Sequence, residues 1–172
     1  TLRFLYDGSY EEFRDALFAV GELPIPKWIR IKPEEIDNER FHTIFAKNEG
    51  AVATPAAGLH FSRELFKRME IRDVNSTYLT LHMGLGHFRK VDVEDLSKHK
   101  MDSEQMHIPE ETADKINSTK AAGGKIFAVG ITVVRALETP VTTRKEVKPY
   151  NGWTNKFIFP PYDFAIPDAL VT

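Results

Sequence analysis

The stretch GGKIFAVGITVVRALE, residues 123–138, constrains the fold more than any other part of the sequence. It contains a short apolar run typical of a buried strand, then Gly130, then a segment with helical composition. This order predicts a strand that passes directly into a helix, whose free N–H groups would face an anionic or polar ligand. Arg135 and Glu138 are three positions apart and would share one helix face, where they are expected to pair. The alternative is an ordinary turn followed by a surface ion pair.

Other segments show capping signals and apolar patterns. Ser9 and Glu12 form a capping box, and Gly21 is suited to end the helix that follows it. Helices are predicted at residues 8–21, 62–70 and 108–124. Strands are predicted at residues 76–84 and 87–93, the short runs 39–46 and 50–55 also fit strands, and residues 140–152 fit a loop. Helices that alternate with apolar strands predict an α/β fold, with a mixed sheet and helices packed on its faces.

Composition restricts the function classes. The 172 residues are 42% hydrophobic and 28% charged, which suits a single α/β domain spanning residues 1–172. The net charge of −2 gives no sign of the basic face usual in nucleic-acid binders. Cysteine is absent, and no apolar run reaches the roughly 18 residues of a membrane span. We therefore expect a cytoplasmic monomer with no membrane partner. Because the sequence opens on a strand-like stretch and closes on an apolar one, we expect a fragment of a longer protein.

Two histidines follow leucine and lie among small residues. His60 is in TPAAGLHFS, residues 54–62, and His82 is in LHMGLGHF, residues 81–88. This setting favours imidazoles at a pocket wall, where they could exchange protons because imidazole titrates near neutral pH. The alternative is that both are structural histidines. No histidine pair has the helical spacing of a zinc motif, so no metal is expected.

Several blocks together resemble one family, the S-adenosylmethionine:tRNA ribosyltransferase-isomerases of queuosine biosynthesis. The blocks recur in the family's order and cover most of the chain. They are GELPIP (21–26), ER (39–40), GAVATPAAGLHFS (50–62), TLHMGLGHF (80–88), HKMDSE (99–104), GGKIFAVGITVVRALE (123–138) and GWTNKFIFPPYDF (152–164). The resemblance implies that the chain is most of the family's larger α/β domain, without its small β-barrel domain.

The resemblance also implies a reaction. S-adenosylmethionine would be the ribosyl donor. Its ribosyl unit would move to the 7-aminomethyl-7-deazaguanine at the tRNA wobble position and isomerise, giving epoxyqueuosine with release of adenine and methionine. The sulfonium acidifies the neighbouring carbon, so the chemistry needs a positioned base, and a proton donor as adenine leaves. The resemblance implies that His60 and His82 line this site, and we expect His60, His82 and Glu104 to be the catalytic residues. We expect the substrates to be bound by Glu22, Arg40, Thr132, Arg135, Glu138 and Tyr162.

The sequence departs from the family pattern at five positions. Ala56 and His87 each stand where the family has threonine, and Asp102 stands where it has histidine. Ile131 replaces a threonine, and Pro161 replaces a glycine. Such changes remove hydrogen bonds worth about 1 kcal/mol each near the expected pocket. They keep open two alternatives, a paralogue with an altered substrate and a non-catalytic module that binds RNA or a nucleotide. A third interpretation, a metal-dependent hydrolase, requires a bound metal.

Overall fold

The structure is a computed structural model that describes residues 3–25 and 29–172. The chain divides into two compact units, residues 1–40 and 41–172, and each is described separately. Pro26, the last residue of the GELPIP block, lies outside the described residues. The sequence-based expectation of a single domain stays a prediction. No helix among the described residues is both long enough and apolar enough to cross a membrane.

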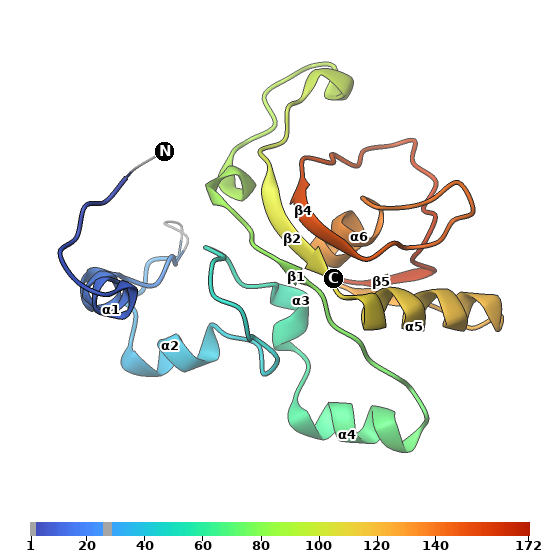
Figure 1. Cartoon of the computed structure of the whole chain (residues 1–172), viewed down its shortest axis with the longest axis horizontal. Helices are drawn as coiled ribbons and strands as arrows, with labels where there is room; N and C mark the ends of the chain where they lie inside the picture. The colour runs from blue at the N-terminus through green and yellow to red at the C-terminus, as the bar shows by residue number, and fades with distance from the viewer. Residues whose placement is uncertain (1–2, 26–28) are drawn as a thin grey trace. The chain divides into compact units, whose positions relative to one another are not determined.

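The first unit contains two helices among its described residues, α1 (Tyr10–Val20) and α2 (Glu35–Arg40) (Figure 1). The predicted capping box is confirmed, because the Ser9 side chain accepts from the Glu12 backbone N–H while the Glu12 carboxylate accepts from the Ser9 backbone N–H. Phe13 packs against Phe4 and Tyr6, with ring centroids 5.5 and 5.4 Å apart. This aromatic cluster holds the extended N-terminal segment against α1.

The second unit begins with two helices that lead into its first sheet. These are α3 (Ala56–Leu59) and α4 (Arg63–Ile71), and Ser62 caps α4 as predicted by accepting from the Leu65 N–H. The antiparallel sheet has the order β1-β2-β4, from β1 (Thr80–Leu81), β2 (Glu104–Ile108) and β4 (Tyr150–Thr154). The 3-10 turns η1 (Leu85–Phe88) and η2 (Leu96–Lys98) lie between β1 and β2.

The strand–glycine–helix prediction is confirmed by β3 (Phe127–Val129) and α6 (Ile131–Leu137), which are joined by Gly130. A second sheet pairs β3 in parallel with β5 (Ala169–Val171), and the Gly130 N–H donates to Val171 O. Gly130 has a φ of +100°, a backbone conformation that favours glycine. Arg135 on α6 hydrogen-bonds to Glu104 on β2 and to Thr154 O on β4, so this helix brings a side chain to the antiparallel sheet.

The core lies between the antiparallel sheet and the helices α5 (Glu110–Ala121) and α6. Alternate residues of β2 point into it, because Glu104, Met106 and Ile108 are buried while Gln105 and His107 are exposed. Core side chains come from both helices and from later loops, namely Ala113, Ile116, Ala136, Leu137, Val147 and Ile166. The α/β class is therefore confirmed, with antiparallel and parallel pairing in separate sheets.

Several predicted strands are wrong. Residues 87–93 contain the end of η1 and then irregular backbone, and the runs 39–46 and 50–55 form no strand. The predicted strand at 76–84 shrinks to Thr80–Leu81. Conversely, β4 begins inside residues 140–152, which were predicted to form a loop.

Candidate active site

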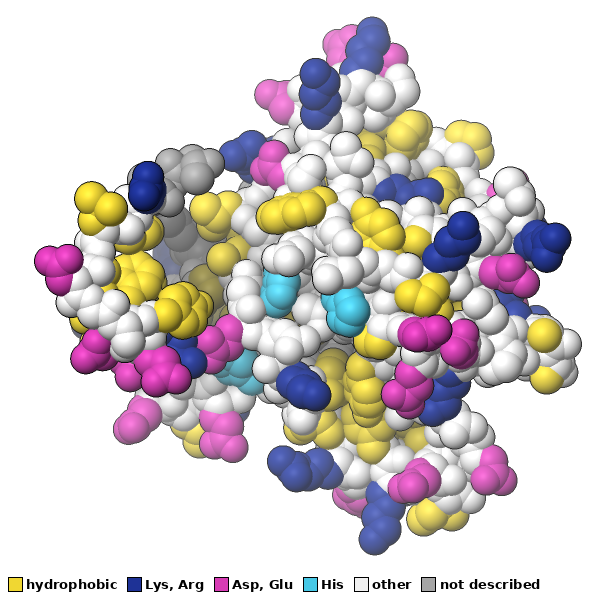
Figure 2. Space-filling view, in the orientation of Figure 1, with side chains coloured by type: hydrophobic (Ala, Val, Ile, Leu, Met, Phe, Trp, Pro, Cys, Tyr) yellow, Lys and Arg dark blue, Asp and Glu magenta, His cyan; other side chains and the backbone are white. Residues whose placement is uncertain are grey.

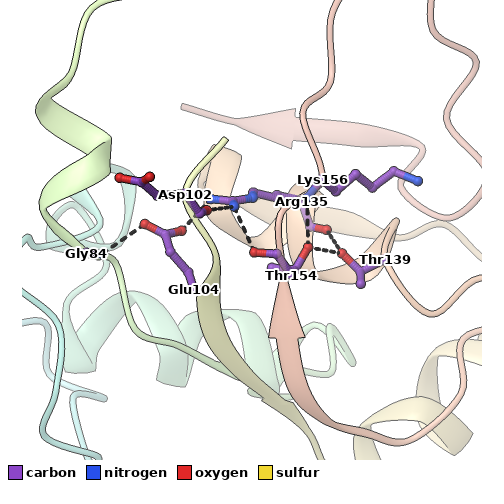
Figure 3. Close-up of polar contacts among 7 residues, drawn as sticks. All are labelled: Gly84, Asp102, Glu104, Arg135, Thr139, Thr154 and Lys156. Atoms are coloured by element: carbon purple, nitrogen blue, oxygen red, sulfur yellow. Dashed lines mark hydrogen bonds and ion pairs between the residues drawn. The ribbon is translucent and has the colours of Figure 1, made fainter. Parts of the chain in front are cut away.

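A buried ion pair lies at the start of β2. Arg135 on α6 donates from its Nη1 to Oε2 of Glu104, and the two side chains are only 10% and 3% exposed. The other carboxylate oxygen, Oε1, accepts from the backbone N–H of Gly84 at 2.9 Å. Burying two charges is costly unless further hydrogen bonds satisfy them, and this carboxylate is engaged on both oxygens. Figure 3 shows the pair between β2 and α6.

Arg135 also joins the two longer strands of the sheet. Its Nη2 donates to Asp102 O and to Thr154 O, both at 3.1 Å. Thr139, one turn along from Arg135, donates to Arg135 O and contacts the Thr154 hydroxyl, each at 2.8 Å (Figure 3). We call Gly84, Glu104, Arg135, Thr139 and Thr154 the Arg135 network. The planar guanidinium suits this role because it presents several donors in a fixed geometry.

Glu138 does not pair with Arg135, although the sequence predicted that it would. Its carboxylate is 2% exposed and accepts from the N–H groups of Ala165 and Ile166 and from the Tyr162 hydroxyl, each at 2.9 Å. Arg135 and Glu138 share one side of α6, but each bonds to a different element. Arg135 pairs with Glu104 on β2, and Glu138 bonds to the loop before β5. Burial raises the pKa of Tyr162 to about 12, with further contributions from the hydrogen bond to Glu138 and its negative charge.

His82 follows β1 and is tied down on its main chain. Its N–H donates to Gln105 O, and Met83 O accepts from the Val52 N–H, both at 2.9 Å. The imidazole lies against Gly50, where an added Cβ would be only 2.8 Å from Nδ1. His82 is half-buried, and its place at a pocket wall stays a prediction. Its catalytic role stays a prediction.

His60 is the residue at which α3 ends, and its side chain is exposed. Among the contacts of residues 3–25 and 29–172, none joins the imidazole of His60 to the imidazole of His82. Thr132 lies in the first turn of α6 and is half-buried, with its hydroxyl 3.5 Å from the position that a Cβ on Gly130 would take. Thr132 is therefore next to the strand–helix junction, where the sequence predicted it.

Glu22 and Arg40 belong to the first unit. Glu22 follows α1 and Arg40 is the last residue of α2, and both side chains are exposed. Their predicted roles in substrate binding stay predictions.

Two of the departures from the family pattern have a structural setting. Asp102 forms a surface ion pair with Arg89 at 3.2 Å, and only its backbone carbonyl joins the Arg135 network. A Cβ on Gly86 would collide with this carboxylate at 2.3 Å, so Asp102 fills space beside η1. His87 lies exposed within η1.

Among the described residues, no group of three or more His, Cys, Asp or Glu side chains is placed to hold a metal ion. Figure 2 shows acidic and basic side chains interspersed on the visible face of the second unit, with histidine rings among uncharged atoms.

Sequence reasoning missed three members of the Arg135 network: Gly84, Thr139 and Thr154. Gly84 contributes only its backbone N–H, which no residue type reveals. Thr154 carried no clear sequence signal either, because its strand reads YNGWT and places the apolar Trp153 on the exposed face.

Comparison with known proteins places this sequence in a family. The sequence profile described as "Queuosine biosynthesis protein" matches residues 1–172. The S-adenosylmethionine:tRNA ribosyltransferase-isomerase of Phocaeicola vulgatus is 59% identical over the whole chain, which covers 49% of that protein. The proteins of the same name from Bacteroides fragilis and Flavobacterium psychrophilum are 60% and 55% identical, again over the whole chain and 49% of their own length. The chain thus spans about half the length of the curated relatives it matches. The match over every residue shows that this chain belongs to the queuosine biosynthesis protein family.

Proposed function

We propose that the full-length protein containing this chain is an S-adenosylmethionine:tRNA ribosyltransferase-isomerase. Its substrates are S-adenosylmethionine and a tRNA that carries 7-aminomethyl-7-deazaguanine at the wobble position, and its tRNA product carries epoxyqueuosine. The family match over residues 1–172 carries this proposal. We further propose that it works in the cytoplasm as a monomer without a metal.

The proposed chemistry needs a base beside the sulfonium donor and a proton donor for adenine. His60 and His82 are our candidates, because imidazole can accept and donate protons near neutral pH. The half-buried position of His82 against Gly50 supports this role, since its ring has a fixed neighbour on one side. Thr132, at the start of α6, is our candidate for contact with the adenosyl or ribosyl group.

Charged groups would hold the remaining parts of the substrates. Arg40 is our candidate for a carboxylate or phosphate, because a guanidinium fits both in a two-pronged geometry. Glu22 is our candidate for accepting a hydrogen bond from a donor group of the substrates. Arg135, Glu138 and Tyr162 are engaged with protein partners, which favours a role in shaping the binding site over direct contact.

Mass spectrometry tests the reaction. The full-length protein is incubated with S-adenosylmethionine and a tRNA bearing the 7-deazaguanine, and the modified nucleoside is weighed. A gain of the ribosyl mass with release of adenine is expected. Binding of the tRNA without a product would instead identify the chain as a nucleotide- or RNA-binding module. Elemental analysis of the purified protein tests the metal-dependent hydrolase, which stoichiometric zinc or manganese would favour.

Substitution of the two histidines tests the proposed base. We expect His60→Ala or His82→Ala in the full-length protein to lower kcat by about 10²-fold or more, the usual contribution of a proton-transfer group. His107→Ala is the matched control, because His107 is exposed on β2 and has no role in the proposed site. Full turnover by both His60→Ala and His82→Ala would remove the histidines from the mechanism.

A further inference from the structure

The turn that follows His82 is held by the buried carboxylate of Glu104. The N–H of Gly84, two residues after His82, donates to Oε1 of Glu104 at 2.9 Å. The His82 N–H and Met83 O are both bonded to other main-chain groups. Glu104 therefore adds a side-chain contact to a set of main-chain contacts that fixes three consecutive residues.

Glu104 is itself held in place by Arg135. The guanidinium bonds to Oε2 of Glu104 and also to carbonyls at Asp102 and Thr154, so it is anchored to β2 and β4 at once. At 3% exposure, and with both oxygens engaged, the Glu104 carboxylate has little access to a substrate atom. A group that exchanges a proton with substrate must come within hydrogen-bond reach of it.

We propose that Glu104 is a positioning residue: with Arg135 it fixes the turn at Gly84, and thereby holds the His82 imidazole against Gly50. This differs from the direct catalytic role that we expected for Glu104 from the sequence. The effect on turnover rests on the proposed function, whereas the effect on the Gly84 turn does not.

Glycine at position 50 completes the arrangement from the other side. Gly50 has a φ of +140°, and a Cβ there would come within 3.2 Å of three imidazole atoms of His82. The His82 ring thus has the backbone of Gly50 on one side. The chain that carries the ring is confined as well, because Glu104 holds the turn at Gly84. This confinement can pre-organise a proton-transfer group, whose efficiency depends on geometry.

The first test measures the Gly84 amide in the full-length protein by NMR hydrogen exchange. In Glu104→Gln, the side-chain amide has a single acceptor oxygen. The charged guanidinium of Arg135 is the stronger donor and keeps that oxygen, so the amide NH2 group faces the Gly84 N–H, which loses its acceptor. We expect the Gly84 amide to exchange at least about tenfold faster, since a hydrogen bond to a charged group is lost. Unchanged protection of this amide would overturn the proposal, whether or not the protein transfers ribosyl groups.

Asn117→Ala is the control for general loss of stability. Asn117 bonds to both the N–H and the C=O of Val147 at 2.9 Å, so its removal breaks another partly buried clamp away from Gly84. We expect this variant to leave Gly84 exchange within about twofold of the parent, because the exchange of an amide reports its own local opening. Equal acceleration in both variants would overturn the specific link between Glu104 and the turn.

The second test uses turnover and leaves Glu104 intact. Gly84→Pro removes the N–H donor, whereas Gly84→Ala keeps it, and the new Cβ would lie 4.0 Å from Oε1 of Glu104. We expect kcat to be at least about tenfold lower in Gly84→Pro than in Gly84→Ala, with similar KM for S-adenosylmethionine. We also expect the pH profile of kcat in Glu104→Gln to keep its shape. Loss of one limb of that profile, with full turnover in Gly84→Pro, would identify Glu104 as a proton-transfer group and overturn the proposal.

Discussion

Tyr162 links the loop before β5 to the end of α6, because its hydroxyl donates to the buried carboxylate of Glu138. Its pKa is raised to about 12, first by burial and then by Glu138. A tyrosine in the unfolded chain titrates near pH 10, so its unfolded form loses the proton first. The stabilisation is therefore fully present below about pH 10 and is lost as the pH rises through about 12.

We expect Tyr162→Phe to remove this part of the alkaline decline in the free energy of unfolding. Urea unfolding at a series of pH values measures it, with the unmodified protein as the reference. An alkaline decline of the same slope in both proteins would contradict the assignment, because the phenylalanine ring has no proton to lose in this pH range.

Arg135 and Glu104 should be strongly coupled in stability. Arg135→Met or Glu104→Met each leaves a buried charge without its partner, which typically costs about 3–5 kcal/mol, whereas the double replacement leaves none. We expect the double variant to lose at least about 1 kcal/mol less than the sum of the single losses, measured by urea unfolding. The control is the exposed ion pair of Arg68 and Glu64 on α4, which are 2.5 Å apart with both side chains 72% exposed. Its coupling free energy should be about 0.5 kcal/mol. Equal coupling in the two pairs would contradict this expectation.

At the scale of elements, the junction of β3 and α6 depends on Gly130. Its φ of +100° is strained for any residue with a Cβ. We expect Gly130→Ala to lower the free energy of unfolding by about 1–3 kcal/mol. Gly84→Ala is the matched control, because Gly84 has a φ of −94° and should change stability by less than about 0.5 kcal/mol. Similar unfolding midpoints for the two variants would refute the strain argument.

Strand β2 separates core from surface by alternation. Ile108 is 0% exposed, so Ile108→Ala should cost about 2–5 kcal/mol through lost burial and the cavity left behind. His107→Ala, one position earlier on the exposed face, should change stability by no more than about 0.5 kcal/mol. Chemical denaturation measures both, and a comparable loss in His107→Ala would contradict the register of β2.

Elements with strong local signals could be predicted from the sequence, and those that depend on partners could not. The capping box of Ser9, the cap of α4 by Ser62 and the turn at Gly130 are short-range features, and each is confirmed. Strand β4 was missed because its pairing with β2 joins segments distant in the sequence. The predicted strand at 87–93 is wrong because its alternating residues face no sheet.

In the candidate site, too, the residues with local signals could be predicted, whereas their distant partners could not. The sequence indicated Glu104, Arg135 and Glu138, yet the partners of each come from other elements. Arg135 and Glu138 share a helix side, and the local rule that pairs such neighbours gave the wrong partner, because Glu104 and the Ala165–Ile166 backbone approach from outside the helix. Local spacing identifies candidates for burial, whereas tertiary packing decides which groups they meet.

On the scale of the whole molecule, the second unit contains the complete Arg135 network and the His82 turn. Glu22 and Arg40 belong to the first unit, so the expected binding residues are divided between the two. Relatives that carry the ribosyltransferase-isomerase name are about twice as long as this chain. Assays of the proposed reaction therefore require the full-length protein.

The parallel pairing of β3 with β5 has a consequence during synthesis. Residues 127–129 leave the ribosome well before residues 169–171, and until then the backbone of β3 and the N–H of Gly130 lack the partners that β5 supplies. An unpaired strand edge is a template for wrong association. The nascent chain therefore passes through a stage in which the edge of β3 is unpaired, and this stage lasts until residues 169–171 have also left the ribosome.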